Sequence, residues 1–466
     1  MNQAVTRGGF FSKERITAGP GFNRWMVPPA ALAIHLCIGQ AYAFSVFNKP
    51  MTQLLGISES APDDWTIPQL GWIFSIAIVF LGLSAAFAGK WLEEVGPRKA
   101  MFTAACCFGG GFMVAALGLQ LHQLWMVYFG YGVLGGIGLG VGYVSPVSTL
   151  IKWFPDRRGM ATGMAIMGFG GGAMIASPLS LKLMNAFKSD TSMGVTETFL
   201  VLGIVYFIYM CIGALAVRIP PADWKPEGWT PPVQQNAMIS RNHVHIDRAI
   251  KTPQFWLLWW ALCLNVTAGI GVLGQASLMI QESFQGMITA AAAAGFVGLL
   301  SLANMSGRFL WSTVSDYIGR KVTYGTFFVL GTILYLLVPG MGTAGHVTLF
   351  VLFYLIILSM YGGGFSTVPA YLADLFGTRY VGGIHGRLLT AWSAAGIFGP
   401  VLVNYIRDYQ LQMGIPPSDV YIYTMYVMAG LLVIGFICNM MIRPVSAEHH
   451  MSAEAIAAEP IAAGAK

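Results

Sequence analysis

Residues 89–99 read Gly89-Lys90-Trp91-Leu92-Glu93-Glu94-Val95-Gly96-Pro97-Arg98-Lys99, a polar turn between two apolar runs. A partial copy follows 223 residues later, from Trp311 to Lys321, in which Asp316 corresponds to Glu93 and Gly319 to Gly96. Pro146 and Pro369 are related by the same displacement. An internal repeat of this kind predicts two similar halves built from the same arrangement of elements.

The composition around these turns is that of a membrane protein. Hydrophobic residues make up 56% of the 466 residues and charged residues only 10%, with a mean hydropathy of +0.64, which does not describe a soluble domain. Apolar runs long enough to cross a bilayer predict twelve transmembrane helices. The expected spans are residues 25–47, 68–91, 100–119, 123–150, 159–185, 197–217, 253–281, 286–314, 322–340, 346–372, 386–406 and 419–442.

The repeat groups these spans into two pseudo-symmetric six-helix bundles of an all-α membrane protein, residues 25–217 and 253–442. Residues 218–252 between them are polar, basic and contain prolines, which predicts a cytoplasmic linker. Residues 1–24 are expected to form a cytoplasmic N-terminal segment. Residues 443–466, rich in Ala, Glu and His, are expected to form a disordered tail.

Lysine and arginine indicate the orientation in the membrane. Of the 26 such residues, 21 would lie on the side of the two termini, four on the opposite side and one, Arg308, within the membrane. Because positive charge is enriched on the cytoplasmic side, both termini are expected to be cytoplasmic, in a bacterial-type inner (plasma) membrane. The net charge of +6 follows from this topology. No nucleic-acid partner and no obligatory protein partner need be invoked.

Several other classes of site lack support in the sequence. All six cysteines lie within the apolar spans, which favours packing over a disulfide or a metal site. The glycine-rich stretches 132–142 and 168–172 lack the preceding strand and the Lys-Ser or Lys-Thr that a phosphate loop requires. No zinc-protease helix and no nucleophile elbow is present. We therefore expect no cofactor and no enzymatic activity.

The turn at residues 89–99 and its copy resemble the loop between the second and third helices of the major facilitator superfamily. The resemblance covers essentially the whole chain, and it implies two bundles that rock about a central site to give alternating access. It also implies that Glu93 and Asp316 pair with helix N-termini or loop arginines when the cytoplasmic side is shut. A charge cluster that only sets the topology is the alternative. The expected gate residues are Gly89, Glu93, Gly96, Arg98, Lys99, Asp316, Gly319 and Arg320.

Separated motifs in the same order are similar to the oxalate:formate antiporter family and to the related monocarboxylate transporters. They are Ile38-Gly39-Gln40-Ala41-Tyr42-Ala43-Phe44-Ser45-Val46-Phe47, Trp153-Phe154-Pro155-Asp156-Arg157-Arg158-Gly159 with Gly168-Phe169-Gly170, Pro220-Pro221-Ala222-Asp223-Trp224, and Thr252-Pro253-Gln254-Phe255-Trp256.

Arg308 is the expected centre of the binding site. It lies within the apolar stretch 290–314, roughly 12 Å from the membrane surface that Asp316 marks, at about 1.5 Å per helical residue. An arginine at this depth costs on the order of 2.5–3.5 kcal/mol, so it usually faces a cavity and meets an anion. Its planar fork can donate two parallel hydrogen bonds to one carboxylate. The resemblance implies the same role, and snorkelling or bonding to backbone carbonyls is the alternative.

Three departures from these families bear on the substrate. Trp392 stands where the oxalate antiporter has a second cation, a lysine. The site would then hold one fixed cation, Arg308, and an indole N–H, which suits a monoanion better than a dianion. Asn304 stands where the monocarboxylate transporters have an aspartate as proton carrier. Ser45 and Val46 occupy the stretch of their helix-1 lysine. These departures favour exchange of two anions, or proton coupling through another group.

Polar and aromatic side chains are expected to complete the site around Arg308, although each ring could equally pack or anchor the chain. They are Gln40, Tyr42, Tyr143, Asn304, Trp311 and Trp392. His35, seven residues before Tyr42 and on roughly the same helix face, is a candidate for proton coupling. A packed histidine is the alternative.

The resulting hypothesis is a secondary transporter for a small organic anion, a monocarboxylate such as formate, pyruvate or lactate, with a counter-anion or a proton as the coupled species. An oxalate:formate antiporter is one alternative. A transporter-like sensor that binds a carboxylate without moving it is the other.

Overall fold

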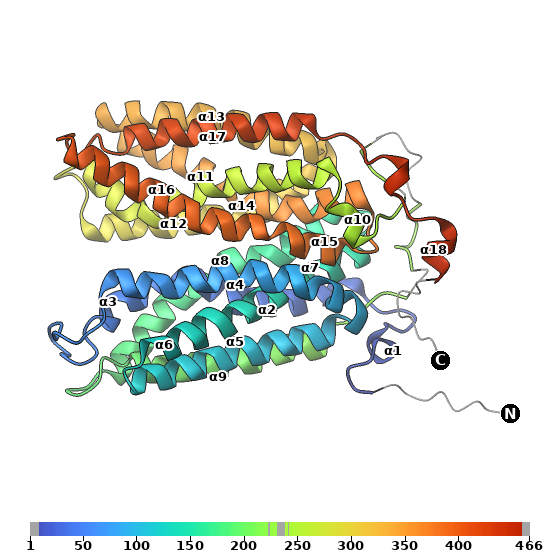
Figure 1. Cartoon of the computed structure of the whole chain (residues 1–466), viewed down its shortest axis with the longest axis horizontal. Coiled ribbons are helices and arrows are strands. Elements are labelled where there is room, and N and C mark those ends of the chain that lie inside the picture. The colour runs from blue at the N-terminus through green and yellow to red at the C-terminus, as the bar shows by residue number, and fades with distance from the viewer. Residues whose placement is uncertain (1–8, 222–223, 231–237, 241, 459–466) are drawn as a thin grey trace.

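The structure is a computed structural model, which describes residues 9–221, 224–230, 238–240 and 242–458. The described residues are helical apart from turns, loops and three isolated β-bridges. Two groups of long helices lie side by side, the first blue to green and the second yellow to red (Figure 1). Both α1 (Lys13–Ile16) and α18 (Ala453–Ala458) lie at one end of the molecule, here called the terminal side.

The first bundle contains six long helical runs, two of which change their helical type along their length. The elements are η1 (Arg24–Met26), α2 (Val27–Ile38), η2 (Gly39–Phe47), α3 (Asn48–Met51), α4 (Ile67–Val95), α5 (Pro97–Gln120), α6 (Leu124–Val127), η3 (Tyr128–Gly135), α7 (Gly136–Trp153), α8 (Arg158–Phe187) and α9 (Val195–Ala216). The elements η1 to α3 form one run, and so do α6 to α7.

The second bundle follows the linker and repeats this plan. The elements are α10 (Ile246–Ala249), α11 (Pro253–Ser283), α12 (Ala290–Ile318), α13 (Arg320–Thr343), α14 (Val347–Phe376), α15 (Val381–Leu388), α16 (Thr390–Gln412), α17 (Ile422–Met441), η4 (Ala447–His449) and α18. Here α15 and α16 together form one run.

Eleven of these runs are long and apolar enough to cross a membrane. The twelfth helix of the pattern is α12, which has 29 residues and carries Asn304, Arg308 and four serines. The prediction of an all-α protein with twelve membrane helices is therefore confirmed. The predicted break between the fourth and fifth spans is also found, because α7 ends at Trp153 and α8 begins at Arg158.

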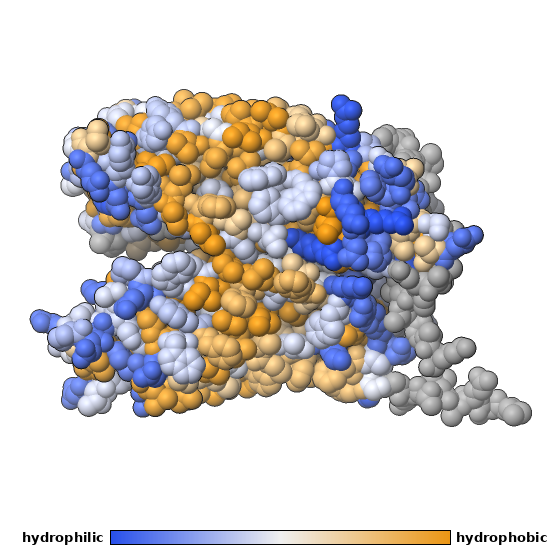
Figure 2. Space-filling model, in the orientation of Figure 1, coloured by the Kyte–Doolittle hydropathy of each residue, from blue (hydrophilic) through white to orange (hydrophobic). Residues whose placement is uncertain are grey.

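The outer surface matches a bilayer. Figure 2 shows hydrophobic side chains over the middle of both bundles and hydrophilic side chains toward the two ends. Large apolar residues are exposed on the long helices, for example Trp72 at 62% and Phe87 at 82% on α4. In water, so large an exposed apolar surface would drive association, whereas lipid tails cover it without cost.

The repeated turn has the same backbone in both halves. Gly96 ends α4 and precedes α5 with φ 84° and ψ 167°, and Gly319 stands between α12 and α13 with φ 87° and ψ 151°. This region is essentially restricted to glycine. The two glycines of the sequence repeat therefore reverse the chain in the same way.

The linker packs against the terminal side of the second bundle. The Ser240 and Val244 N–H groups donate to the carbonyls of Asp374 (2.7 Å) and Phe376 (2.9 Å) at the end of α14. Arg387 donates to Asp247 at 2.6 Å, and this hydrogen bond lowers the pKa of the Asp247 carboxyl.

The described part of the C-terminal tail also follows a defined path, unlike the disorder expected from its composition. It carries η4 and α18, the Met451 N–H donates to the His243 carbonyl at 2.8 Å, and Arg379 donates to the Ile456 carbonyl at 3.2 Å. The His243 carbonyl of the linker and the Arg379 side chain after α14 thus supply partners that the tail's own composition does not reveal. Parts of the predicted terminal segments and linker, namely residues 1–8, 222–223, 231–237, 241 and 459–466, lie outside the described residues.

Candidate substrate site

Arg308 lies at the centre of the molecule with no exposed surface. Helix α12 positions it against α8 of the other bundle. Its Nε donates to Asn304 Oδ1 at 3.0 Å, one turn earlier, and its Nη1 donates to the Ile166 carbonyl at 3.4 Å. Its Nη2 has no hydrogen-bond partner among the described residues. The guanidinium thus spans the boundary between the bundles and keeps one donor group free.

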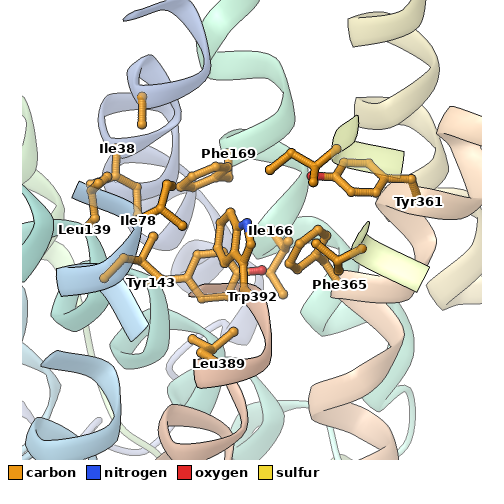
Figure 3. Close-up of a cluster of buried hydrophobic side chains, with 14 of the residues drawn as sticks. Ile38, Ile78, Leu139, Tyr143, Ile166, Phe169, Tyr361, Phe365, Leu389 and Trp392 are labelled. Atoms are coloured by element: carbon orange, nitrogen blue, oxygen red, sulfur yellow. The ribbon is translucent and has the colours of Figure 1, made fainter. Parts of the chain in front are cut away.

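Aromatic rings enclose this guanidinium. Its central carbon lies 5.1 Å from the ring centroid of Phe365 and 5.5 Å from that of Phe169, within the range of cation–π attraction. The Trp392 ring packs against both of these rings, at 4.5 and 5.2 Å. Figure 3 shows Trp392 between Tyr143, Phe169 and Phe365. The rings exclude water and so strengthen electrostatic interactions within the site.

Two further donors in this aromatic cluster are unsatisfied. The Tyr143 hydroxyl and Trp392 Nε1 are buried and have no hydrogen-bond partner within the described chain. Their rings lie 5.3 Å apart. No carboxylate of the described residues forms an ion pair with Arg308. The site therefore has a positive charge and several free donors, without a negative group of its own.

Tyr42 joins the cluster from η2, the 3-10 segment of the first span. Its hydroxyl lies 3.0 Å from that of Tyr361 on α14, and its ring packs against Phe169 at 5.0 Å. This hydroxyl pair links the two bundles. Tyr42, Tyr143 and Trp392 are thus brought to the centre together with Arg308.

Gln40 and Trp311, which were predicted to line the site, point elsewhere. Gln40 Oε1 accepts from the Tyr131 hydroxyl at 3.0 Å inside the first bundle. Trp311 Nε1 donates to Ser359 Oγ at 3.0 Å, and its ring packs on Phe327 inside the second bundle. In this conformation, neither side chain forms part of the cluster around Arg308.

His35 is fully buried on α2 and packs against Tyr143, with 5.3 Å between the ring centroids. Its Nδ1 lies 3.2 Å from the Ala31 carbonyl one turn earlier. This contact places His35 at the edge of the aromatic cluster.

Sequence reasoning missed Phe169, Tyr361 and Phe365 as members of the cluster. A signal for Phe169 was available, because the displacement of 223 residues that relates the two halves makes it the counterpart of Trp392. Tyr361 and Phe365 are separated by one helical turn of α14, and their sequence context of Gly and Ser carries no comparable signal.

The predicted gate acids both contact helix N-termini of the opposite bundle. Asp316 accepts from the N–H groups of Gly159 (2.8 Å) and Met160 (2.9 Å) at the start of α8. Glu93 accepts from the N–H of Gly382 (3.2 Å) at the start of α15, and from Lys152 Nζ at 2.8 Å. Helix N-termini carry partial positive charge, so these contacts hold the bundles together on the terminal side.

Ion pairs reinforce this closure. Asp374 accepts from Arg158 of the first bundle at 2.9 Å and from Arg320 of the second at 3.1 Å. Arg320 also donates to Asp316 at 2.6 Å. One connected network therefore joins α8, α12, α13 and α14.

Other predicted gate residues have different surroundings. Gly89 lies so close to Gly383 of α15 that a Cβ on it would come within 2.7 Å of the Gly383 Cα. Arg98 donates to the carbonyls of Phe10 and Leu215, both in the first half of the chain, and Lys99 is exposed. In this conformation Arg98 and Lys99 do not bridge the bundles.

The sequence model described as Major Facilitator Superfamily matches residues 30–400, which is most of the chain. The chain belongs to the major facilitator superfamily. Solved structures of the superfamily share the fold: the transporter FucP in an outward conformation has a TM-score of 0.62 at 13% identity, covering 88% of this chain and 98% of that one. A bacterial homologue of the iron transporter ferroportin has a TM-score of 0.62 at 12% identity, covering 89% and 98%.

Relatives within the superfamily are transporters rather than enzymes. The chain is 27% identical over 383 residues to the oxalate:formate antiporter of Oxalobacter formigenes, covering 81% of this chain and 83% of that protein. It is 24% identical to apicoplast pyruvate carrier 1 of Toxoplasma gondii, covering 72% and 70%. It is 27% identical over 197 residues to monocarboxylate transporter 1 of Rattus norvegicus, covering 41% and 36%.

Proposed function

We propose that this superfamily member is a secondary active transporter of a small organic anion, a monocarboxylate such as formate, pyruvate or lactate, and that Arg308 binds the carboxylate. The observation that carries the proposal is the set of buried donors without acceptors, namely Arg308 Nη2, the Tyr143 hydroxyl and Trp392 Nε1. Leaving a buried donor unsatisfied costs about 1–3 kcal/mol. A carboxylate, which only accepts hydrogen bonds, supplies what these groups lack.

The charge of the site favours a monoanion. Arg308 is the fixed cation of the aromatic cluster, and Trp392 contributes an uncharged indole N–H. One carboxylate balances one guanidinium, whereas a second carboxylate would be buried among rings without a counter-charge, which is costly. The relative named as an oxalate:formate antiporter makes oxalate the main alternative substrate. Formate–anion exchange is compatible with the same charge balance.

The contacts between the bundles support alternating access. Asp316 and Glu93 close the terminal side, which we propose to be the cytoplasmic side of the inner membrane because it carries most of the lysines and arginines. Rocking of the bundles would break these contacts and open the site to that side. The anion would then leave toward the cytoplasm or exchange for another, as alternating access requires.

Transport into proteoliposomes tests the proposal. Labelled formate, pyruvate, lactate, acetate and oxalate are offered to the wild type and to Arg308→Gln, with and without internal anion or a pH gradient. We expect uptake of a monocarboxylate by the wild type. The substitution removes a charged hydrogen-bond partner worth about 2–5 kcal/mol, so uptake should fall about thirtyfold or more.

The same assay separates the alternatives. A sensor would bind a carboxylate but show no exchange of label across the membrane. An oxalate:formate exchanger would prefer oxalate over pyruvate and lactate. Transport of an identified carboxylate that is unchanged in Arg308→Gln would refute the role of Arg308.

A further inference from the structure

Two buried histidines from opposite bundles flank Tyr143. His35 lies on α2 of the first bundle, and His385 lies on α15 of the second. Their ring centroids are 5.3 and 5.9 Å from that of Tyr143, and their exposed fractions are 0% and 1%. Tyr143 in turn packs against Trp392 of the substrate cluster. The two imidazoles therefore lie next to the proposed carboxylate site and on either side of the moving interface.

Each imidazole keeps a ring nitrogen without a partner. The contact of His35 Nδ1 with the Ala31 carbonyl fits an Nδ1–H donor, which leaves Nε2 as an acceptor lone pair. His35 Nε2 and His385 Nε2 are both buried, and neither has a hydrogen-bond partner in the described part of the chain. Packing alone gives no reason for two such nitrogens at one interface, since an apolar side chain would fill the space without this cost.

The charged groups around the pair make it sensitive to the substrate. Arg308 of α12 is the cation of the adjoining aromatic cluster, and Tyr143 of α7 is the titratable group that packs against both histidines. On α4, Glu93 reaches the start of α15 but is already paired with Lys152. With the site empty, the Arg308 charge and burial oppose a second positive charge. A bound carboxylate removes this opposition.

We propose that His35 and His385, with Tyr143 between them, form a proton-binding site that fills together with the carboxylate site. This inference rests on the proposed function, carboxylate transport, and it makes the proton the ion that is transported together with the carboxylate. A proton from water adds to the Nε2 lone pair of one imidazole while a carboxylate binds Arg308. One negative and one positive charge then cross together, so the loaded carrier gains no net charge. Each ligand raises the affinity for the other by the same factor.

The location of the pair suits this role. Because the two histidines belong to different bundles, rocking that opens the terminal side moves them apart and exposes both nitrogens to water on that side. The proton can then leave with the anion. A site inside one bundle and away from the interface would stay buried through the same motion.

Proteoliposomes loaded with a pH-sensitive dye provide the test, with labelled pyruvate as the probe anion. Net uptake without internal anion is compared with exchange against internal pyruvate, which requires no net proton movement. The variants are His35→Asn and His385→Asn. His346→Asn is the matched control, because His346 is exposed in a short loop before α14. Exchange activity also reports whether each variant is folded.

In the wild type and in His346→Asn, net pyruvate uptake should acidify the lumen. An inward proton gradient should raise the rate of net pyruvate uptake about tenfold, which is within the usual range of coupling between two binding sites. His35→Asn and His385→Asn should lose this stimulation but retain exchange. Net pyruvate uptake by the wild type without proton entry, or variants that keep the wild-type number of protons per pyruvate, would overturn the proton site and leave the carboxylate site standing. Absence of both exchange and uptake for every carboxylate offered would overturn the proposed function itself.

Discussion

The rings of Phe169 and Trp392 lie 5.2 Å apart, although 223 residues separate them in the sequence. They occupy equivalent positions in the two halves, so the repeat places one aromatic ring from each bundle at the centre. Arg308 breaks the symmetry, because its counterpart in the first half is Ala85. The aromatic walls are thus supplied by both bundles, and the charge by the second bundle alone.

Changing Trp392 to lysine tests the link between charge number and substrate. Trp392→Lys would place a second cation beside Arg308, so that a dianion could balance both charges. We expect the preference for oxalate over pyruvate to rise about tenfold or more, equivalent to roughly 1.4 kcal/mol. Inhibition of labelled pyruvate exchange by unlabelled oxalate measures this preference.

Trp392→Phe is the control for this experiment. It removes the indole N–H but keeps an aromatic ring, so monoanion binding should weaken without any gain for oxalate. If Trp392→Lys binds oxalate no better than Trp392→Phe does, charge number does not set the selectivity of the site.

Neutralising Asp316 should open the terminal side. Asp316→Asn loses the carboxylate that accepts from the N-terminus of α8 and from Arg320. Hydrogen bonds to charged groups are worth about 1.5–3 kcal/mol, so the population open on this side should rise by about tenfold or more. Distances between spin labels at Lys99→Cys on α5 and Val322→Cys on α13, with the native cysteines replaced, report the change.

Asp408→Asn serves as the control for neutralising an acid, because the Asp408 side chain is 66% exposed on α16. Its distance distribution should match that of the parent protein. An Asp316→Asn distribution that also matches the parent would mean that Asp316 does not hold the gate closed.

Much of the fold follows from the sequence because its signals are strong and local. Apolar length indicates the twelve spans, and a polar turn with its copy indicates two halves. Arg308 stands out as a charge in an apolar helix, and burial of a charge demands a partner or a function. The contacts of Glu93 and Asp316 with helix N-termini follow from the positive ends of α8 and α15.

The lining of the site was harder to predict, because helices that are apolar on all sides do not reveal which face meets the centre. Gln40 and Tyr42 are two residues apart, yet Gln40 bonds to Tyr131 inside its own bundle, whereas Tyr42 reaches Tyr361 across the interface. The 3-10 geometry of η2 sets these directions and is not visible in the sequence. A hydrogen bond from Trp311 Nε1 to Ser359 Oγ likewise directs the Trp311 side chain away from Arg308.

Asp64 should make stability depend on pH. Burial raises the pKa of its carboxyl, but hydrogen bonds from the N–H groups of Leu55, Gly56 and Ala61 outweigh this and lower it. A carboxyl group whose pKa is lowered in the folded state stabilises the protein at pH values above the pKa of the unfolded state, which is near 4. This stabilisation is lost as the pH falls through the pKa of the folded state.

Asp64→Asn should therefore lower the melting temperature of the detergent-solubilised protein at pH 7, with a loss of about 1–3 kcal/mol. The difference from the wild type should shrink as the pH falls below the unfolded-state pKa, near 4. The neighbouring Asp63 is exposed, so Asp63→Asn should melt like the wild type at each pH. A constant difference between Asp64→Asn and the wild type across this range would contradict the assignment.

A methyl group at Gly159 should prevent closure of the terminal side. A Cβ there would lie 2.0 Å from the Ser312 carbonyl oxygen on α12, a backbone atom that cannot move without displacing the helix. We expect Gly159→Ala to lose anion exchange and to show the longer spin-label distance between α5 and α13. Gly110→Ala on α5 is the matched control, because its Cβ would meet nothing within 4 Å. Normal exchange by Gly159→Ala would show that α8 and α12 need not approach this closely during transport.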